Sequence, residues 1–144
     1  MSVSGINGSG RPMTVFDIAG RAMSAQLMRL NTTASNLANA GAVSGTQAGA
    51  FRALRPVFHT VTDSPGVATV QVSTVVQSNT QPTRLHDPNN PLADHNGDVW
   101  QAGVDSSTEL IEMVEASRQY QNDVQVMQTA KTLTLDTLKL GSSS

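Results

Sequence analysis

The sequence predicts a mainly α-helical protein with a small β insertion, in which long N- and C-terminal helices pair as a coiled coil around a β-hairpin and loop region. Apolar or small residues recur every three or four positions near both ends of the chain, where proline is absent from residues 13–40 and 106–140. Valine and threonine dominate residues 51–77, which predicts the β insertion.

We expect residues 13–41 to form the first helix. Its apolar positions alternate in steps of three and four, with Gly20 in the one vacant slot: Phe16, Met23, Leu27, Leu30, Ala34 and Leu37. This alternation is the a/d spacing of a coiled coil. Thr14 or Asp17 is suited to cap the start of the helix, and Gly41 to end it.

We expect residues 105–141 to form the second helix. Ser106 and Glu109 have the spacing of a capping box at its start. The same alternation then runs through Leu110, Met113, Ser117, Tyr120, Val124, Met127, Ala130, Leu133, Thr137 and Leu140. One extra three-residue step, from Met127 to Ala130, predicts local overwinding of the coiled coil. A pattern of this length favours a coiled coil over an ordinary globular helix.

The intervening region, residues 42–104, is expected to hold a hairpin and loops. Residues 51–62 and 67–77 are the predicted strands, joined by a turn over 63–66 that contains proline and glycine. Alternation predicts one buried face with Val70, Val72 and Val76 and an opposite polar face with Thr69, Gln71 and Ser73. Residues 78–98 carry three prolines and are predicted to be a long loop, followed by a short strand over 99–101.

Composition excludes several classes of protein. The formal net charge is −2 and only 14% of residues are charged, which does not fit a nucleic-acid-binding surface. Cysteine is absent, so the chain has no disulfide, thiolate metal site or cysteine nucleophile. No run of 18 apolar residues is present, and no membrane span is expected.

The two ends of the chain are expected to be flexible. Residues 1–12 are rich in glycine and serine and lack the apolar stretch of a secretory signal peptide. They are interpreted as a flexible lead, and Met13 is a second candidate start. Residues 142–144 are three serines and are interpreted as a flexible tail.

The polar cluster over residues 86–98 is the candidate for metal or catalytic chemistry. It contains His86, Asp87, Asp94 and His95. Asp94, Asn96, Asp98 and Asp105 match positions 1, 3, 5 and 12 of a calcium loop, but Val99 stands where that loop requires glycine. A turn-rich loop built on asparagine and aspartate explains the cluster better. The sequence therefore predicts no cofactor, no metal site and no enzyme.

The predicted helices contain few charged residues and few large apolar residues. Between residues 13 and 40 only Asp17, Arg21 and Arg29 are charged, while 49 of the 144 residues in the chain are Ser, Thr, Asn or Gln. Solvent-facing helix surfaces normally carry charged residues. We therefore expect these helices to pack against further helices of their own kind.

Short motifs at both ends resemble the flagellar basal-body rod protein family of bacteria, and most closely its proximal rod C type. The N-terminal motifs are FDIAG at 16–20 and ASNLAN at 34–39, and the C-terminal motifs are YQ at 120–121, AK at 130–131 and LKLG at 138–141. The stretch from His86 to Gly97 also resembles that type. The chain departs from the family pattern at the Gly/Ala-rich segment 40–50 and at Asn122-Asp123.

This resemblance implies a structural subunit whose paired terminal helices form the inner-tube domain of a helically polymerised rod, the drive shaft from rotor to hook. It implies type III export without signal cleavage and assembly at the basal body in the periplasm. The implied partners are copies of the chain, other rod proteins, proteins of the rotor-ring and export-apparatus junction, and the export machinery. Two alternatives stay open: a small metal-dependent enzyme using His86, Asp94 and His95, and a cytoplasmic helical adaptor or chaperone.

The apolar positions at a/d spacing, which form the expected seam of the coiled coil, and the family motifs together predict the residues at the subunit interface. These are Phe16, Met23, Leu27, Leu30, Ala34, Asn36, Leu37, Asn39, Leu110, Met113, Tyr120, Gln121, Val124, Met127, Ala130, Leu133, Leu138 and Leu140. Asn36 and Asn39 are three residues apart on one helix face, where their amides are expected to bridge neighbouring subunits or cap the helix end.

Overall fold

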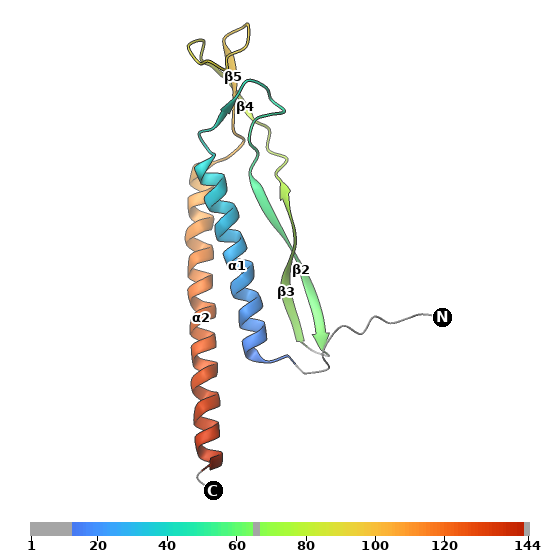
Figure 1. Cartoon of the computed structure of the whole chain (residues 1–144), viewed down its shortest axis with the longest axis vertical. Helices are drawn as coiled ribbons and strands as arrows, with labels where there is room; N and C mark the ends of the chain where they lie inside the picture. Colours follow the sequence, from blue (N-terminus) through green and yellow to red (C-terminus); the bar gives the residue numbers. More distant parts are fainter. Residues whose placement is uncertain (1–12, 65–66, 143–144) are drawn as a thin grey trace, which may run out of the picture.

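The computed structural model describes residues 13–64 and 67–142 and shows an elongated molecule (Figure 1). The elements in chain order are α1 (Val15–Ala38), β1 (Val43–Ser44), β2 (Leu54–Ser64), β3 (Val67–Gln77), β4 (Thr83–His86), β5 (Asp98–Gln101) and α2 (Ser106–Ser142). The expected flexible lead, residues 1–12, and residues 143–144 of the expected tail lie outside the described residues. Ser142, the first residue of that expected tail, ends α2.

The two helices begin with different caps. At α1 the Thr14 hydroxyl accepts from the Asp17 backbone N–H, and the Asp17 carboxylate accepts from the Thr14 N–H at 2.9 Å. Of the two expected caps Thr14 is therefore the N-cap, and Asp17 completes a capping box with it. At α2 the carboxylate of Asp105 accepts from the Ser107 N–H at 2.9 Å. The expected capping box of Ser106 and Glu109 is therefore wrong, because the Glu109 side chain turns into the interior instead.

The two helices lie side by side and run in opposite directions (Figure 1). The inward side of α2 carries half-buried residues at three- and four-residue spacing: Met113, Ser117, Tyr120, Val124, Met127 and Ala130. On α1 the buried residues are Ala19, Ala25, Thr32, Thr33 and Asn36. Coiled-coil pairing is not confirmed, because α1 packs both against α2 and against the hairpin. Phe16, Leu27 and Ala34, which belong to the expected seam, are exposed.

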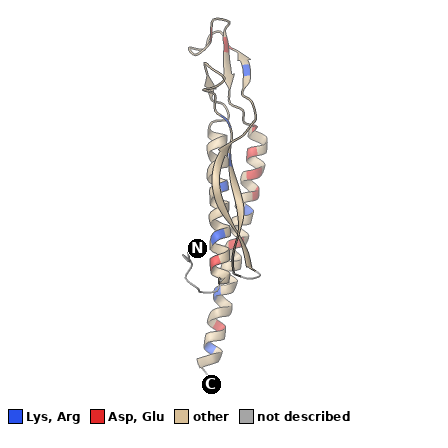
Figure 2. Ribbon diagram, turned by 90° about the vertical axis from the view of Figure 1, so that its right-hand side faces the viewer, with Lys and Arg blue, Asp and Glu red and all other residues tan. Residues whose placement is uncertain are grey.

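The hairpin β2–β3 is antiparallel and packs along α1, as Figure 1 and the perpendicular view in Figure 2 show. The expectation of a buried valine face is wrong, since Val70 and Val76 are exposed and Thr69 is buried. The Thr69 hydroxyl accepts a 2.9 Å hydrogen bond from Arg21 of α1. A register shift between Val57 and Phe58 also interrupts the simple alternation of faces.

A small three-stranded sheet, in the order β1-β5-β4, lies beyond the end of the helix pair where α1 ends and α2 begins (Figure 1). Strand β5 confirms the expected short strand near residues 99–101. Strand β4 corrects the expectation that residues 78–98 are all loop, because Thr83–His86 pairs with Asp98–Gln101. Among the described residues, no helix is long and apolar enough to cross a membrane.

Candidate assembly site

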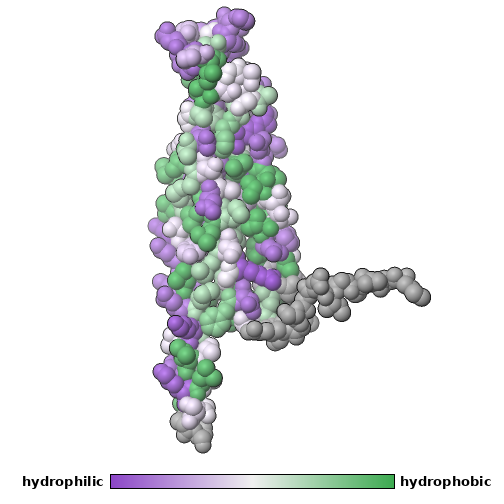
Figure 3. Space-filling view, viewed as in Figure 1, coloured by the Kyte–Doolittle hydropathy of each residue, from purple (hydrophilic) through white to green (hydrophobic). Residues whose placement is uncertain are grey.

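The C-terminal end of α2 extends past α1 and is exposed throughout. Every residue from Lys131 to Ser142 is exposed, and Leu133, Leu138 and Leu140 expose 63%, 64% and 74% of their surface. Apolar patches on this end are visible in the space-filling view (Figure 3). Leu135 is exposed as well, and four exposed leucines within eight residues are an unusual cluster for a helix that faces only water.

The outer face of α1 is exposed and carries no charged side chain over residues 24–38. Its exposed residues are Ser24, Leu27, Asn31, Ala34 and Ala38. The two arginines of α1, Arg21 and Arg29, are half-buried and lie off this face. A Cβ atom added at Gly20 would meet no other atom within 4 Å, so the surface there is open. This face is uncharged, as helix surfaces that become buried usually are.

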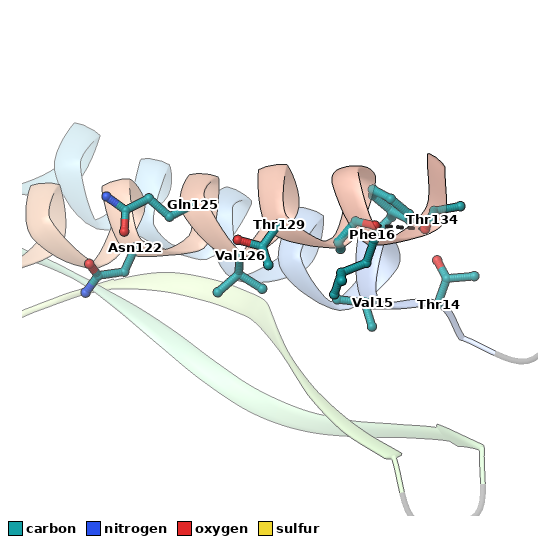
Figure 4. A pocket seen from close by; sticks show the side chains of 10 residues that line it. Thr14, Val15, Phe16, Asn122, Gln125, Val126, Thr129 and Thr134 are labelled. Carbon is teal, nitrogen blue, oxygen red and sulfur yellow. Dashed lines mark hydrogen bonds between the residues drawn. The ribbon is translucent and has the colours of Figure 1, made fainter. Parts of the chain in front are cut away.

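A groove lies between the start of α1 and the second half of α2 (Figure 4). Its volume is about 990 Å³, and its lining is Thr14, Val15, Phe16, Asn122, Gln125, Val126, Thr129, Ala130, Leu133 and Thr134. None of these ten residues is charged. Val15 and Phe16 come from α1 and face the α2 side chains, so the groove marks the place where the packing of the two helices ends.

Where α1 ends and α2 begins, the side chain of Asn36 connects three elements of the fold. Its side-chain amide nitrogen donates to the Leu54 carbonyl at 2.9 Å and to the Glu109 carboxylate at 3.0 Å. Its side-chain oxygen accepts from the Leu54 N–H at 2.7 Å. Asn36 is fully buried. One side chain thereby joins α1, the first residue of β2 and the first turn of α2.

Arg55 and two glutamates complete this junction. The Arg55 guanidinium binds Glu109 at 2.7 Å through one nitrogen and Glu112 at 2.7 Å through another. The Glu109 side chain is 0% exposed, whereas Arg55 is 35% exposed. A buried carboxylate needs such partners, because an unpaired buried charge is strongly unfavourable. We call Asn36, Arg55, Glu109 and Glu112 the junction.

Sequence reasoning missed the junction. Glu109 was assigned to a helix cap because of its spacing from Ser106, and Arg55 was not singled out. The available signal was an arginine in a strand of valine and phenylalanine, directly before Pro56. A charged residue in such a strand indicates a partner on another element, although the sequence does not show which one.

The expected interface residues fall into three groups. Eight are exposed: Phe16, Leu27, Ala34, Leu110, Gln121, Leu133, Leu138 and Leu140. Nine are half-buried: Met23, Leu30, Leu37, Asn39, Met113, Tyr120, Val124, Met127 and Ala130. Asn36 alone in this set is fully buried, and its side-chain amide bonds to Leu54 and Glu109 of the same chain. The Asn39 amide donates to the Ser35 carbonyl at 2.8 Å and so caps its own helix.

The polar cluster near β5 is used for local structure. The Asp94 carboxylate accepts from the N–H groups of Asp98 and Asn96, and these bonds, that from Asp98 most, lower the pKa of Asp94 below its ordinary value. His86 contacts Asp98 at 2.9 Å, and Arg84 also pairs with Asp98. Within residues 13–64 and 67–142, no three His, Cys, Asp or Glu residues form a group that could hold a metal ion.

Two further carboxylates have shifted pKa values: Asp105, directly before α2, and Asp123, within it. Hydrogen bonds from the Thr108 hydroxyl and from the N–H groups of Ser107 and Thr108 lower the pKa of Asp105. Burial raises the pKa of Asp123, which lies half-buried on the inward side of α2. Asp105 therefore favours the start of α2 when it is ionised, whereas Asp123 opposes the helix packing when it is ionised.

Two protein-family models match the two ends of this chain, and individual proteins match it over most of its length. Residues 16–45 match the family model described as flagella basal body rod protein, and residues 95–140 match the C-terminal model of the flagellar basal body rod FlgEFG proteins. The flagellar basal-body rod protein FlgC of Salmonella typhimurium is 44% identical over 131 residues, which cover 90% of this chain and 97% of that protein. FlgC of Yersinia enterocolitica is 43% identical with the same coverage. FlgC of Buchnera aphidicola from Acyrthosiphon pisum is 32% identical over 89% of this chain and 96% of its own.

Proposed function

The chain belongs to the flagellar basal-body rod protein family, and we propose that it polymerises helically through its terminal helices into the proximal rod. Its function is that of a structural subunit of the flagellar basal body. The finer proposal is that copies of the chain form part of the drive shaft that transmits torque from the rotor to the hook.

The exposed apolar end of α2 is the observation that carries this proposal. Burying a leucine that is now exposed contributes about 1.5–3 kcal/mol, and Leu133, Leu138 and Leu140 each expose more than 60% of their surface. A neighbouring subunit would recover that free energy. The uncharged outer face of α1 has the same character. We assign to the assembly surface the exposed residues Phe16, Leu27, Ala34, Leu110, Gln121, Leu133, Leu138 and Leu140.

The proposed partners are copies of this chain, other rod proteins, and the proteins where the rotor ring meets the export apparatus. A subunit that repeats by a contact between two different surfaces forms a helical filament if the rotation does not close. The end of α2 and the outer face of α1 are two such different surfaces. We further propose that the chain is exported by the flagellar type III machinery and assembles in the periplasm.

The test uses Leu133→Asp, expressed in cells that lack their own copy of the protein. Because Leu133 is exposed, the variant is expected to fold and to be exported, but to be absent from purified basal bodies, and the cells are expected not to swim. Gln128→Asp is the matched control, since it adds the same charge to an exposed polar position of the same helix. Normal swimming of the Leu133→Asp strain would contradict the proposal. Retention of both variants as soluble cytoplasmic protein would instead favour a helical adaptor.

A further inference from the structure

We propose that Asn96 is a site of spontaneous deamidation, and that the turn around it holds the reaction back while the chain is folded. Asn96 belongs to the loop between β4 and β5, at the end of the molecule beyond the helix pair (Figure 1). The inference does not depend on the proposed function, because it concerns the chemistry of one asparagine within a single chain.

The sequence around Asn96 favours the reaction. An asparagine deamidates when the backbone nitrogen of the next residue attacks its side-chain amide carbon, and glycine hinders this approach least because it has no side chain. Within residues 13–64 and 67–142, Asn96 is the only asparagine that is followed by glycine. Asn96 is exposed, and its side-chain amide makes no hydrogen bond with another described residue. The amide carbon is therefore open to attack.

The reaction needs only water as a co-reactant. The backbone nitrogen of Gly97 loses its proton to water and forms a bond to Cγ of Asn96. The bond from Cγ to the side-chain nitrogen breaks, and that nitrogen takes up a proton and leaves as ammonia. The product is a cyclic succinimide. Water then opens either carbonyl–nitrogen bond of the ring, which leaves aspartate or isoaspartate at position 96.

Hydrogen bonds to Asp94 occupy the backbone where this ring would close. The Gly97 N–H donates to the Asp94 carbonyl at 2.9 Å, so the attacking nitrogen is held towards Asp94 and keeps its proton. The Asn96 N–H donates to Oδ1 of Asp94 at 2.8 Å, and the Asp98 N–H donates to the same oxygen at 3.0 Å. Asp94 thereby fixes the main chain on both sides of the peptide bond between Asn96 and Gly97.

The surroundings of Gly97 add a second restraint. Its φ of 76° lies in the left-handed region that favours glycine. A Cβ atom built there would lie 3.0 Å from Cε1 of His86 and 3.0 Å from Cβ of Pro88, so both side chains lie close against Gly97. Its carbonyl also accepts from the Asp87 N–H at 2.9 Å. Turning the Gly97 nitrogen towards the Asn96 side chain breaks these contacts, and ring closure therefore requires local opening of the loop.

The modification would also damage the turn that delays it. Isoaspartate adds a carbon to the main chain, so the N–H groups at positions 96 and 97 can no longer both reach Asp94. A carboxylate at position 96 lies close in the turn to Asp94 and Asp98, and these like charges repel. We therefore expect the modified chain to have a loosened loop over residues 87–97, which hydrogen exchange of the separated modified form measures.

The main experiment compares the full chain folded in buffer with the same chain unfolded in guanidinium chloride, at the same pH and temperature. Samples are digested over time, and chromatography with mass spectrometry separates the asparagine, aspartate and isoaspartate forms of the peptide that contains Asn96. We expect the reaction in the folded chain to be at least about tenfold slower, because it proceeds only from the locally open loop. The second Asn-Gly pair, Asn7-Gly8, lies outside the described residues and gives the intrinsic rate in the unfolded sample.

Three variants test the role of Asp94. Asp94→Ala removes the oxygen that accepts from two backbone N–H groups, and Asn96 should then react at nearly the unfolded rate in the folded variant. Asp94→Asn keeps an oxygen at Oδ1 and should restore most of the delay. Asn89→Ala changes another exposed residue of the same loop, and its rate should equal that of the wild type. Circular dichroism shows that the helices of each variant are folded.

Each outcome decides one part of the inference. Slow reaction in the folded wild type, with fast reaction in the unfolded chain and in Asp94→Ala, supports it. Equal rates in the folded and unfolded wild type overturn the protection by the fold. A wild-type rate in folded Asp94→Ala overturns the assignment of that protection to the turn. Absence of aspartate and isoaspartate at position 96 in the unfolded chain, while Asn7 reacts, overturns the site itself.

Discussion

Replacing Arg55 with methionine is the sharpest test of how the hairpin is fixed to the helices. Arg55 is the only cation among the four junction residues, and it contacts Glu109 and Glu112 at 2.7 Å each. Methionine keeps most of the side-chain volume and removes the charge. The Glu109 carboxylate, which is 0% exposed, would then keep only the hydrogen bond from Asn36.

The expected cost follows from the burial of the two partners. Removing one partner of a buried ion pair costs about 3–5 kcal/mol, because the other charge stays buried. Arg55 is 35% exposed, and water therefore compensates part of the loss. We expect Arg55→Met to lower the free energy of unfolding by about 2–3 kcal/mol. For a chain of this size, such a loss lowers the melting temperature by roughly 6–10 °C.

A double-mutant cycle isolates the ion pair from the lost packing. Glu109→Gln keeps an oxygen that accepts from Asn36 and removes the charge. We expect the double variant Arg55→Met/Glu109→Gln to be more stable than Arg55→Met, because no buried charge is left unpaired. Urea unfolding followed by circular dichroism at 222 nm measures all four proteins. Hydrogen exchange of the β2 and β3 amides shows whether the hairpin loosens first.

Two results would refute this reasoning. One is an Arg55→Met variant within 0.5 kcal/mol of the wild type, which would mean that Glu109 finds water or another partner. The other is strict additivity of the two single changes, which would mean that Arg55 and Glu109 do not interact in solution.

The remaining predictions concern the helices. Leu30→Asp should lower the urea midpoint of the isolated chain, because Leu30 is half-buried, whereas Leu133→Asp should leave it nearly unchanged. Asp105→Ala should remove an acid-sensitive part of the helicity. Ionised Asp105 stabilises the start of α2 above about pH 3.8, and this contribution is lost as the pH falls through the lowered pKa of the folded chain. Circular dichroism between pH 2 and 6 measures the loss. Asp123→Asn should raise the urea midpoint at pH 7. The difference should shrink as the pH falls through the raised pKa and vanish below about pH 3.8, where the carboxyl is protonated in the unfolded chain as well. Limited proteolysis of the isolated chain should cut within residues 131–142 before it cuts the hairpin, as mass spectrometry of the fragments would show.

The sequence was sufficient for the two helices and the hairpin, because their signals are local. The cap at Thr14 and the helical spacing of the proline-free stretches both depend on residues that are close together in the sequence. The expected turn over 63–66 includes Pro65 and Gly66, which lie outside the described residues. Strands β1 and β4 were missed because they are short, and their pairing with β5 is set by contacts between distant segments. Thr69 was expected to be exposed, but its partner Arg21 lies 48 residues away.

The candidate site was predicted only in part, for a physical reason. Hydrophobic periodicity shows that a face will be buried, and it does not show whether the burying partner belongs to the same chain or to another. Tyr120 and Leu138 are 18 residues, or five helical turns, apart and so lie on the same side of α2. Tyr120 is nevertheless half-buried in the subunit, whereas Leu138 is exposed. Asn36 was expected at the interface because it belongs to the family motif, whereas its hydrogen bonds are all made within the chain.

The division between the junction and the end of α2 suits a subunit that must fold before it can assemble. Every bond of the junction joins residues of one chain. The hairpin, the second half of α1 and the first half of α2 can therefore reach their final arrangement without a neighbouring subunit. Residues 131–142 at the end of α2 are all exposed, and helices without packing gain little stability. A change at the junction should therefore lower monomer stability and assembly together, whereas a change at Leu133 or Leu138 should affect assembly alone. Measuring both quantities on the same variants would show whether the two functions are as separate as the contacts indicate.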